Sequence, residues 1–430
     1  MKKNSVNIVT LGCSKNLVDS QKLMRQLEAG GYSVKADYQG DTDIVIINTC
    51  GFILDAKEES INTIMEHAAT IRERGHGKLI VMGCLAERYH DELIAEIPEV
   101  DAWFGVNNPS EIVARLGQVY QPSLTGERIL PAQKHYAYLK IAEGCDRTCA
   151  FCAIPGIRGP YHSVPMDELE DETRFLASRG VKELILIAQD LSYYGLDLYG
   201  RQSLCELTER LARVKGIEWI RLHYLYPANF PMEIIDLMLR NEKICRYIDI
   251  PIQHVSDSQL KKMRRSHGMK ETISLLQEIR RKIPDAAIRT TVIVGHPGET
   301  EKDFNELLDF IKEFRFDRLG AFGYSHEEDT YGYIHYSDDV PERVKEKRVE
   351  LIMNAQQEIS EEHNQAAVGK IMKVIIDRRE GVFYIGRTMH DSPEVDQEIL
   401  ISSSGKIEPG TFINVKITGS NEYDLFADAI

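Results

Sequence analysis

The sequence contains no long apolar segment. Nowhere in its 430 residues do apolar side chains approach the run of roughly 20 that a membrane-spanning helix needs. The first residues, MKKNSVNIVT, carry two lysines but no sustained apolar stretch behind them, so the pattern of a secretory signal is missing. We therefore expect a protein that is not exported, that has no membrane partner and that works in the cytoplasm.

Positive charge is also in short supply. The chain has 52 Lys and Arg against 67 Asp and Glu, a formal net charge of −15. Such a chain is repelled by nucleic acid phosphates and attracted by basic proteins, unless a local basic patch reverses the balance. We therefore favour a basic protein as partner and do not expect nucleic acid as the direct substrate.

Disulfide bonds are not expected, because the eight cysteines of an unexported chain are more often metal-binding or catalytic. Three of them, Cys145, Cys149 and Cys152, form a CxxxCxxC pattern in EGCDRTCAFC with no fourth cysteine beside it. Structural zinc sites and electron-carrying iron-sulfur clusters both take four protein ligands as a rule. Three thiolates therefore indicate a cluster with one iron left open to a small molecule. A zinc site completed by a distant His or Cys is the alternative.

Residues 1–130 alternate β-branched runs with amphipathic stretches, which predicts a parallel sheet covered by helices. Cys13, Cys50 and Cys84 each stand just past the end of a predicted strand. Because the carboxyl ends of parallel strands form the binding crevice of such a sheet, the three side chains are expected to converge. Any one of them alone could be an ordinary buried side chain. Three at equivalent positions indicate a second metal site.

Residues 131–368 contain six predicted strands with helical patterns between them, which indicates a partial (βα)6 barrel. The CxxxCxxC loop follows the first strand, at the carboxyl end where the chemistry of such barrels lies. Gln189, Gln253 and the glycine-rich VGHPGET segment stand at other strand ends and would face the same mouth. A loop or helix-cap role is the alternative for each of them.

Residues 369–430 change to short alternating strands with turns, typical of a small all-β barrel that holds oligonucleotides or other extended ligands. Residues 371–430 contain six Lys and Arg and ten Asp and Glu, a balance that argues against RNA. The chain is thus predicted to be an α/β protein with three domains, 1–130, 131–368 and 369–430.

Two sets of three cysteines, one over a parallel sheet and one in a loop that opens a partial barrel, followed by a small β domain, resemble the methylthiotransferase branch of the radical S-adenosylmethionine (SAM) enzymes. The resemblance spans essentially the whole chain and implies that the last domain is of the TRAM type. Within the branch, LGCSKNLVDS, NTCGFILDAKEES, YIDIPIQHVSDSQLKKMRR and GRTMHDSPEVD are similar to the enzymes that modify an aspartate of small-subunit ribosomal protein S-twelve. The transfer RNA adenosine methylthiotransferases share the architecture and are the alternative.

The resemblance implies two [4Fe-4S] clusters. One, on Cys145, Cys149 and Cys152, would bind SAM at its open iron, and the other would be held by the dispersed cysteines and carry the transferred sulfur. One SAM molecule would donate the methyl group, and another would supply a radical that removes hydrogen from the β-carbon of the aspartate. No general base is expected. A sulfur donor and an electron donor such as a flavodoxin are implied as further partners.

The resemblance also implies contacts to the organic part of SAM, at strand ends that family enzymes use for its amino group, ribose and adenine. The residues are Phe151, which would pack near the adenine, Gln189, Gln253, Gly295 and Glu299.

Some positions depart from the family pattern. GPYHSV stands where an Arg-rich segment is usual, His296 stands where Phe is common, and Asp329 stands where Gly is common. None of these is a cysteine. Cys205 and Cys245 belong to neither set of three and are predicted to be structural.

Overall fold

The computed structural model describes residues 4–130 and 135–430. The chain divides into two compact units: the first combines 1–132, 143–147 and 153–175, and the second combines 133–142, 148–152 and 176–430. The CxxxCxxC loop therefore contributes Cys145 to the first unit, and Cys149 and Cys152 to the second. The domain boundaries predicted at 130 and 368 stay predictions. In the described part of the chain, no helix combines the length and apolar character needed to cross a bilayer.

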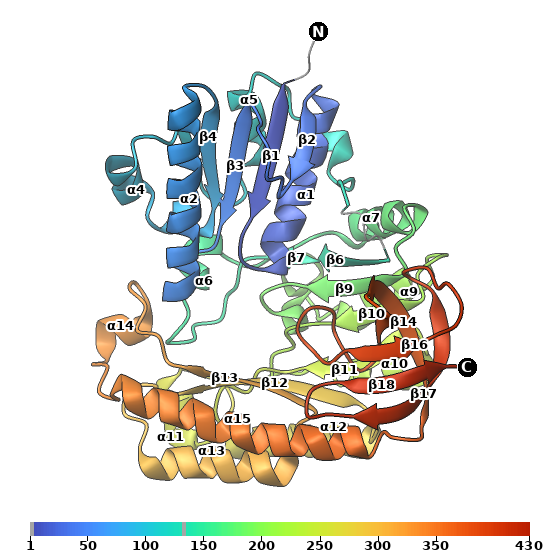
Figure 1. Cartoon of the computed structure of the whole chain (residues 1–430). Coiled ribbons are helices and arrows are strands. Elements are labelled where there is room, and N and C mark those ends of the chain that lie inside the picture. Colours follow the sequence, from blue (N-terminus) through green and yellow to red (C-terminus); the bar gives the residue numbers. More distant parts are fainter. Residues whose placement is uncertain (1–3, 131–134) are drawn as a thin grey trace. The chain divides into compact units, whose positions relative to one another are not determined.

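A five-stranded parallel sheet forms the centre of the first unit, with the strand order β2-β1-β3-β4-β5 (Figure 1). The strands are β1 (Ser5–Thr10), β2 (Ser33–Ala36), β3 (Ile44–Thr49), β4 (Lys78–Gly83) and β5 (Ala102–Phe104). The helices of this unit are α1 (Ser14–Ala29), α2 (Leu54–Arg74), α3 (Cys84–Arg88), α4 (His90–Glu96), α5 (Pro109–Arg115), the 3-10 turn η1 (Pro122–Leu124) and α6 (Ile154–Arg158). The predicted parallel sheet is confirmed.

The central strands of this sheet are mostly apolar, as in residues 44–47 of β3, because helices cover both of their faces. Ile46 of β3 packs in one core with Leu23 of α1, and the next residue, Ile47, packs in the other core with Ile64 of α2. Successive side chains of a strand point to opposite faces, so an unbroken apolar run is what a doubly covered strand requires. The carboxyl ends of these strands are thus held at one edge of a rigid sheet.

The second unit contains a six-stranded parallel sheet in the order β13-β12-β11-β10-β9-β6. Its strands are β6 (Tyr136–Lys140), β9 (Glu183–Ile187), β10 (Trp219–Leu222), β11 (Ile244–Asp249), β12 (Ala287–Val294) and β13 (Arg318–Gly323). Since β6 and β13 are both at an edge, the sheet is open, and the partial (βα)6 barrel expected from the sequence is confirmed. Two short strands, β7 (Ala142–Glu143) and β8 (His162–Ser163), pair separately.

Helices follow the strands as the alternating pattern predicts. They are α7 (Met166–Ser178), η2 (Leu191–Tyr193), α8 (Leu196–Tyr199), α9 (Leu204–Ala212), α10 (Glu233–Arg240), α11 (Asp257–Lys262), α12 (Met269–Lys282), α13 (Glu301–Phe314), α14 (Tyr331–His335) and α15 (Glu342–Gln365). Of these, α15 packs beside the strands β12 and β13, and α13 packs against α15 (Figure 1).

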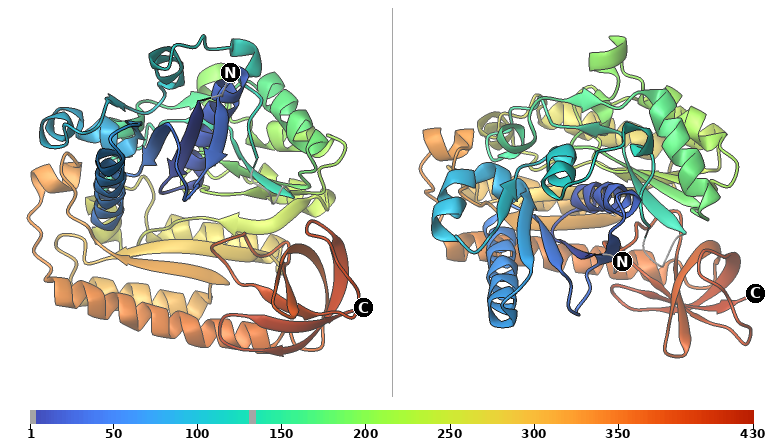
Figure 2. Two further views of the ribbon diagram at one scale, coloured as in Figure 1. Left: turned by 45° about the horizontal axis from the view of Figure 1, so that its top comes forward. Right: turned by 90° about the horizontal axis from the view of Figure 1, so that it is seen from above.

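The last strands of the chain close into a barrel in the order β14-β15-β16-β18-β17, which Figure 2 shows from two further sides. They are β14 (Ile371–Glu380), β15 (Phe383–Arg387), β16 (Ile399–Ser402), β17 (Phe412–Ser420) and β18 (Leu425–Ala429). The pair β16 and β18 is parallel, and β14 pairs with β17 to close the ring. The predicted small all-β barrel is confirmed.

Four acidic residues of this β-barrel domain are engaged with the six-stranded sheet of the same unit. They are Asp377, Asp391, Glu394 and Asp396, which pair with His135, Arg318, Tyr136 and Arg289 respectively. Of the four, Asp391 and Asp396 face arginines of the sheet, whereas Glu394 is exposed and its partner Tyr136 is uncharged. Part of the acidity of this segment is therefore offset within the unit, and the expectation that nucleic acid is not the direct substrate stays a prediction.

Candidate functional site: two sets of three cysteines

Cys13, Cys50 and Cys84 follow three neighbouring strands of the first unit. β1 lies beside β3, and β3 lies beside β4, with all three parallel. Cys50 comes directly after β3, Cys84 directly after β4, and Cys13 three residues after the end of β1. The sheet therefore delivers the three cysteines to one edge, as the sequence predicts.

Glycines beside the cysteines allow these segments to touch. Gly12 has a φ of +85°, and a Cβ added to it would lie 2.7 Å from the Cβ of Cys50. A Cβ on Gly51 would lie 2.8 Å from the backbone nitrogen of Leu85. Neither position has room for a side chain, so the chain segments that carry the three cysteines are packed directly against one another.

The three dispersed cysteines are free thiols, so all three are available as metal ligands. A zinc ion needs every sulfur at about 2.3 Å from a single point. A cubane cluster gives each thiolate its own iron. Three free thiols at neighbouring strand ends are therefore ligands that an iron-sulfur cluster could take.

One cation lies among these thiols. Arg158, at the end of α6, is 4% exposed, and its Nη2 donates hydrogen bonds to Cys84 Sγ at 3.4 Å and to Asn16 Oδ1 at 2.6 Å. Burial raises the pKa of Cys84 to about 11, and the guanidinium opposes this rise. Burial also raises the pKa of Cys50. The site thus supplies a positive charge where thiolates would otherwise be costly.

The CxxxCxxC loop is fixed by backbone hydrogen bonds and by a second arginine. In the second unit, Ala150 N–H donates to Met263 O at 2.9 Å. Arg265 Nη1 lies 3.5 Å from Cys149 Sγ, and its Nη2 donates to the backbone oxygen of Pro251 at 2.8 Å. The guanidinium stacks over the ring of Tyr226 at 4.1 Å, a geometry that favours a cation.

Two glutamines stand at strand ends where cofactor contacts were predicted. Gln189 follows β9 by two residues. Gln253 has a positive φ of 69°. Its backbone is hydrogen-bonded to Thr291 and Ile293 of β12, and this pairing holds the residue in the strained conformation. The buried Oε1 of Gln253 has no hydrogen-bond partner among the described residues, which is the condition of an acceptor that awaits a ligand. Phe151 is half-buried between Cys149 and Cys152. Contact with SAM stays a prediction for all of these residues.

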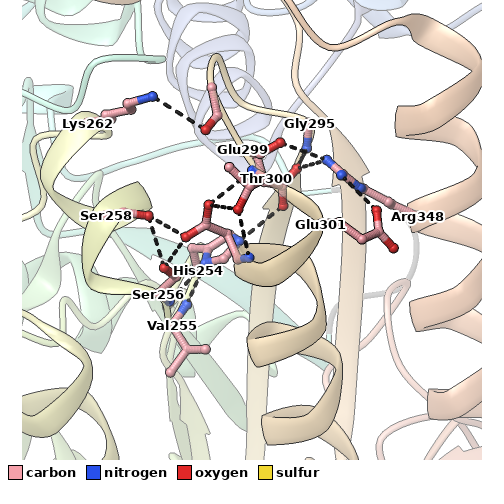
Figure 3. Close-up of polar contacts among 12 residues, drawn as sticks. His254, Val255, Ser256, Ser258, Lys262, Gly295, Glu299, Thr300, Glu301 and Arg348 are labelled. Atoms are coloured by element: carbon pink, nitrogen blue, oxygen red, sulfur yellow. Dashed lines mark hydrogen bonds and ion pairs between the residues drawn. The ribbon is translucent and has the colours of Figure 1, made fainter.

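The carboxylate of Glu299 is already engaged within the protein (Figure 3). It accepts hydrogen bonds from the backbone N–H of Gly295, from His254 Nε2 at 3.1 Å and from Arg348 Nη1 at 2.8 Å. The ring of His254 accepts through Nδ1 from two backbone N–H groups, so its proton lies on Nε2 and points at Glu299. Through these contacts Glu299 stabilises the loop that begins at Gly295. A direct contact between Glu299 and the cofactor stays a prediction.

The same loop ends in a helix cap. Thr300 accepts from the backbone N–H of Asp303, and the Asp303 carboxylate accepts from the backbone N–H of Thr300, a capping box at the start of α13. The hydroxyl groups of Ser256 and Ser258 also donate to Asp303 and hold the pKa of its carboxyl far below the usual range, although burial opposes them. The loop from 295 to 300 is therefore fixed at both ends.

His296 is the unusual member of this loop. Its side chain is fully buried, and neither ring nitrogen has a hydrogen-bond partner among the described residues. The ring meets Tyr324 and Tyr336 edge-on, with centroids 5.0 and 5.9 Å apart. Burial, and after it the charge of Lys262, lower the pKa of His296 to about 3. The ring is neutral at neutral pH and fills the space of an aromatic side chain.

A cavity of about 410 Å³ in the second unit is lined by residues of α15, of the β-barrel domain and of the sheet, among them Arg289 and Arg318. Both arginines lie near the amino ends of their strands, β12 and β13. Chemistry in such sheets takes place at the carboxyl ends. The cavity therefore has no part in the site described here.

Three functional candidates were missed by the sequence reasoning: Arg158, Arg265 and Arg348. Each is 9% exposed or less and carries a charge into the interior. Arg158 occurs in IPGIRG, a short apolar and glycine-rich segment directly after the CxxxCxxC loop. A single charged residue in such an apolar segment could have indicated a buried arginine with a specific partner, since buried charges are normally paired.

Models of three families match the chain. The uncharacterized protein family UPF0004 matches residues 5–105, the radical SAM superfamily matches residues 139–311, and the TRAM domain matches residues 368–430. The three matches coincide in order and kind with the parallel sheet, the partial barrel and the closed β-barrel.

Full-length relatives are numerous. The ribosomal protein uS12 methylthiotransferase RimO of Parabacteroides distasonis is 51% identical, with 100% of both chains covered. The proteins of that name from Phocaeicola vulgatus and Flavobacterium johnsoniae are 53% and 52% identical, covering 100% of this chain and 100% and 98% of their own. The chain belongs to the ribosomal protein uS12 methylthiotransferase family. Like the other uS12 methylthiotransferases, it is a radical SAM transferase that uses SAM and two [4Fe-4S] clusters.

Solved structures agree on the fold. The radical SAM methyltransferase TsrM of Kitasatospora setae superposes with a TM-score of 0.56 at 14% identity, over 74% of this chain and 73% of TsrM. The cobalamin-dependent SAM radical enzyme OxsB gives 0.54 at 13% identity, over 82% of this chain and 56% of OxsB. At such low identity the similarity establishes the architecture of this uS12 methylthiotransferase family member and nothing about its substrate.

Proposed function

We propose that this protein adds a methylthio group to the β-carbon of an aspartate in ribosomal protein uS12, the S-twelve protein of the small subunit. The names of its full-length relatives support this substrate. Because ribosomes are in the cytoplasm, the reaction takes place there. The single observation that carries the proposal is the presence of two separate sets of three cysteines, each following the carboxyl end of parallel strands.

Each set has its own task in this proposal. Cys145, Cys149 and Cys152 would hold the cluster that binds SAM, and Cys13, Cys50 and Cys84 would hold the second cluster. With SAM bound, these groups would supply the radical chemistry that replaces one hydrogen of the aspartate by a methylthio group. An unactivated carbon-hydrogen bond is attacked, so no side chain is needed as a general base. The sulfur donor and an electron donor such as a flavodoxin complete the set of partners.

The chain positions SAM with residues at the strand ends. The Oε1 of Gln253, which has no partner among the described residues, would accept a hydrogen bond from the ligand. The loop that begins at Gly295 is held by Glu299 and Arg348, and Gly295 and Glu299 would contact the cofactor from this loop. Phe151, next to Cys152, packs against the adenine, and Gln189 contributes from the neighbouring strand β9.

A transfer RNA adenosine is the second candidate substrate. The observation in its favour is the closed β-barrel itself, part of whose negative charge is offset by the ion pairs of Asp391 and Asp396 with arginines of the sheet. A barrel of that kind is not barred from a nucleic acid by charge alone. The full-length relatives named for uS12 favour the protein substrate.

The proposal is tested by mass spectrometry after anaerobic incubation of reconstituted enzyme, reductant and SAM with purified uS12. The expected result is a methylthio gain on one aspartate. Two controls define it: a uS12 peptide with that aspartate changed to alanine, and the Cys205→Ala enzyme, which loses a half-buried helical cysteine outside both sets. Formation of 5′-deoxyadenosine without any gain on uS12, together with a gain on transfer RNA, would replace the proposed substrate by the second candidate.

A further inference from the structure

We propose that Arg158 is a positioning residue that holds the Cys84 thiolate and raises the reduction potential of the sulfur-carrying cluster. The inference rests on the proposed placement of that cluster on Cys13, Cys50 and Cys84. It assigns a task to a side chain that is not a ligand and that the chemistry of the reaction does not otherwise use.

The first step is the direct contact. Arg158 Nη2 donates to Cys84 Sγ at 3.4 Å, and both residues are buried, at 4% and 5% exposure. Cys84 itself packs in a small apolar cluster with Ala153, Ile157 and Val106. In such surroundings a hydrogen bond to a charged sulfur is stronger than it is in water.

The second step connects Arg158 to the other two cysteines. The same Nη2 donates to Asn16 Oδ1 at 2.6 Å. The side-chain nitrogen of Asn16 in turn donates to the backbone oxygens of Leu11, at 2.9 Å, and Thr49, at 3.0 Å. Leu11 comes two residues before Cys13, and Thr49 comes directly before Cys50. One guanidinium thus contacts one cysteine and, through one amide, braces the strand ends that carry the other two.

The third step concerns the orientation of the guanidinium. Nη1 donates to both carboxylate oxygens of Glu143, at 2.9 and 3.0 Å, and lies 3.5 Å from Asp19. A planar guanidinium held on one side by a carboxylate can present its other nitrogen in only one direction. Glu143 and Asp19 therefore aim Nη2 at Cys84 and Asn16, and they keep the charge from being left without a partner in the interior.

The consequence is electrochemical. Hydrogen bonds to cluster sulfurs and the net charge nearby set the potential of an iron-sulfur cluster. Reduction adds one negative charge, so a neighbouring cation and an N–H donor stabilise the reduced form more than the oxidised form. Removal of Arg158 is expected to shift the midpoint potential of this cluster to more negative values.

Arg128 provides a matched control. It is a buried arginine of the same unit, 3% exposed, and it pairs with Glu172 at 3.3 Å and with Gln21 at 3.4 Å. Replacing it creates a similar loss of buried charge at a different place. A change that follows only from a damaged interior would appear in both variants.

The experiment uses the full-length chain with Cys145, Cys149 and Cys152 changed to alanine, so that one cluster remains. Arg158→Gln, Arg158→Lys and Arg128→Gln are made in this background. Iron and sulfide per chain and the midpoint potential are measured by a redox titration followed by electron paramagnetic resonance. The expected results are a negative shift for Arg158→Gln, a smaller negative shift for Arg158→Lys, which keeps the charge but not the fork, and no shift for Arg128→Gln.

Two results would overturn the inference in different ways. A fully loaded Arg158 variant with the potential of its parent chain shows that the arginine has no effect on the cluster. A parent chain that takes up no iron contradicts the cluster site itself, and with it the assignment of Arg158. If Arg158→Gln does not fold, the midpoint potential of the conservative Arg158→Lys variant tests the inference instead. A negative shift supports it, and an unchanged potential contradicts it.

Discussion

The two sets of cysteines differ in what holds their members together. Cys145, Cys149 and Cys152 stand within one loop of eight residues, whereas the other three are brought to one edge by three strands of a sheet. Each set nevertheless has one buried arginine that reaches one sulfur: Arg158 at 3.4 Å from Cys84, and Arg265 at 3.5 Å from Cys149. A local motif and a tertiary arrangement thus arrive at the same type of charge compensation.

This difference shows which residues each set of cysteines depends on. The loop depends on its own residues and on the contacts that fix it. The dispersed set depends on the close approach of neighbouring strand ends, and therefore on residues that never touch a metal. Substitutions can disturb either the contacts of the loop or the close approach of the strand ends, and so test the two sets separately.

The largest effect is expected from the cysteines themselves. On the proposed assignment of the clusters, Cys149→Ala should abolish the formation of 5′-deoxyadenosine, because the radical would arise at the cluster on Cys145, Cys149 and Cys152. Cys50→Ala should leave SAM cleavage measurable and abolish the transfer of the methylthio group, because it would remove only the other cluster. Chromatography of the SAM products and mass spectrometry of uS12 separate the two outcomes. Production of 5′-deoxyadenosine by Cys149→Ala would contradict the division of tasks.

A second substitution disturbs only the dispersed set. Gly51→Val places a side chain where a Cβ would already lie 2.8 Å from backbone atoms of Leu85, so the strand ends must separate. The reconstituted variant should lose about half of its iron, because a metal site that cannot close does not retain its metal. Gly156→Ala is the control, since a Cβ there meets no atom within 4 Å. Iron analysis that finds both variants fully loaded would contradict the importance of this contact.

A third substitution acts on the loop alone. Arg265→Gln removes the donor to Cys149 and the cation over the Tyr226 ring. Loss of such a neighbour of a metal ligand costs about 10- to 100-fold in metal affinity or activity. We expect SAM cleavage to fall by that factor while the potential of the other cluster stays unchanged. A fall in the potential of the other cluster as well would show that the two arginines do not act separately.

The smallest effect concerns pH and His296. Its pKa of about 3 lies below the value of the unfolded chain, so the unfolded chain binds the proton first and stability is lost as pH falls below about 6.5. Between pH 7 and pH 5 the loss is about 2 kcal/mol for such a shift. His296→Phe should remove this part of the pH dependence. Thermal unfolding of both proteins at the two pH values gives the difference, and parallel curves would contradict it.

The sequence was sufficient for the strands that are buried on both faces. Runs such as ELILI in β9 predict a strand directly, and the cysteines at their ends follow from the strand-end rule. The short strands β2 and β5 were missed, because SVKA and AWF carry too few residues for any periodicity. A strand of this protein is predictable from the sequence where burial alone determines the type of its residues.

The arginines could not be found in the same way. Arg158 is 74 residues from Cys84 in the chain, and Arg265 is 116 residues from Cys149. No periodicity relates such positions, and only the folded backbone brings them within reach. The positive φ of Gln253 has a similar origin, since it results from pairing with β12 rather than from local sequence.

The closed ring of the β-barrel domain limits how a partner can be recognised. Since β14 pairs with β17, and β16 pairs with β18, each of the five strands has a neighbour on both sides. A protein loop therefore cannot bind by adding a strand to an exposed edge, which is a common route to affinity without sequence specificity. Recognition through this domain has to come from side chains and connecting loops, so it can change by surface substitution without any change to the barrel.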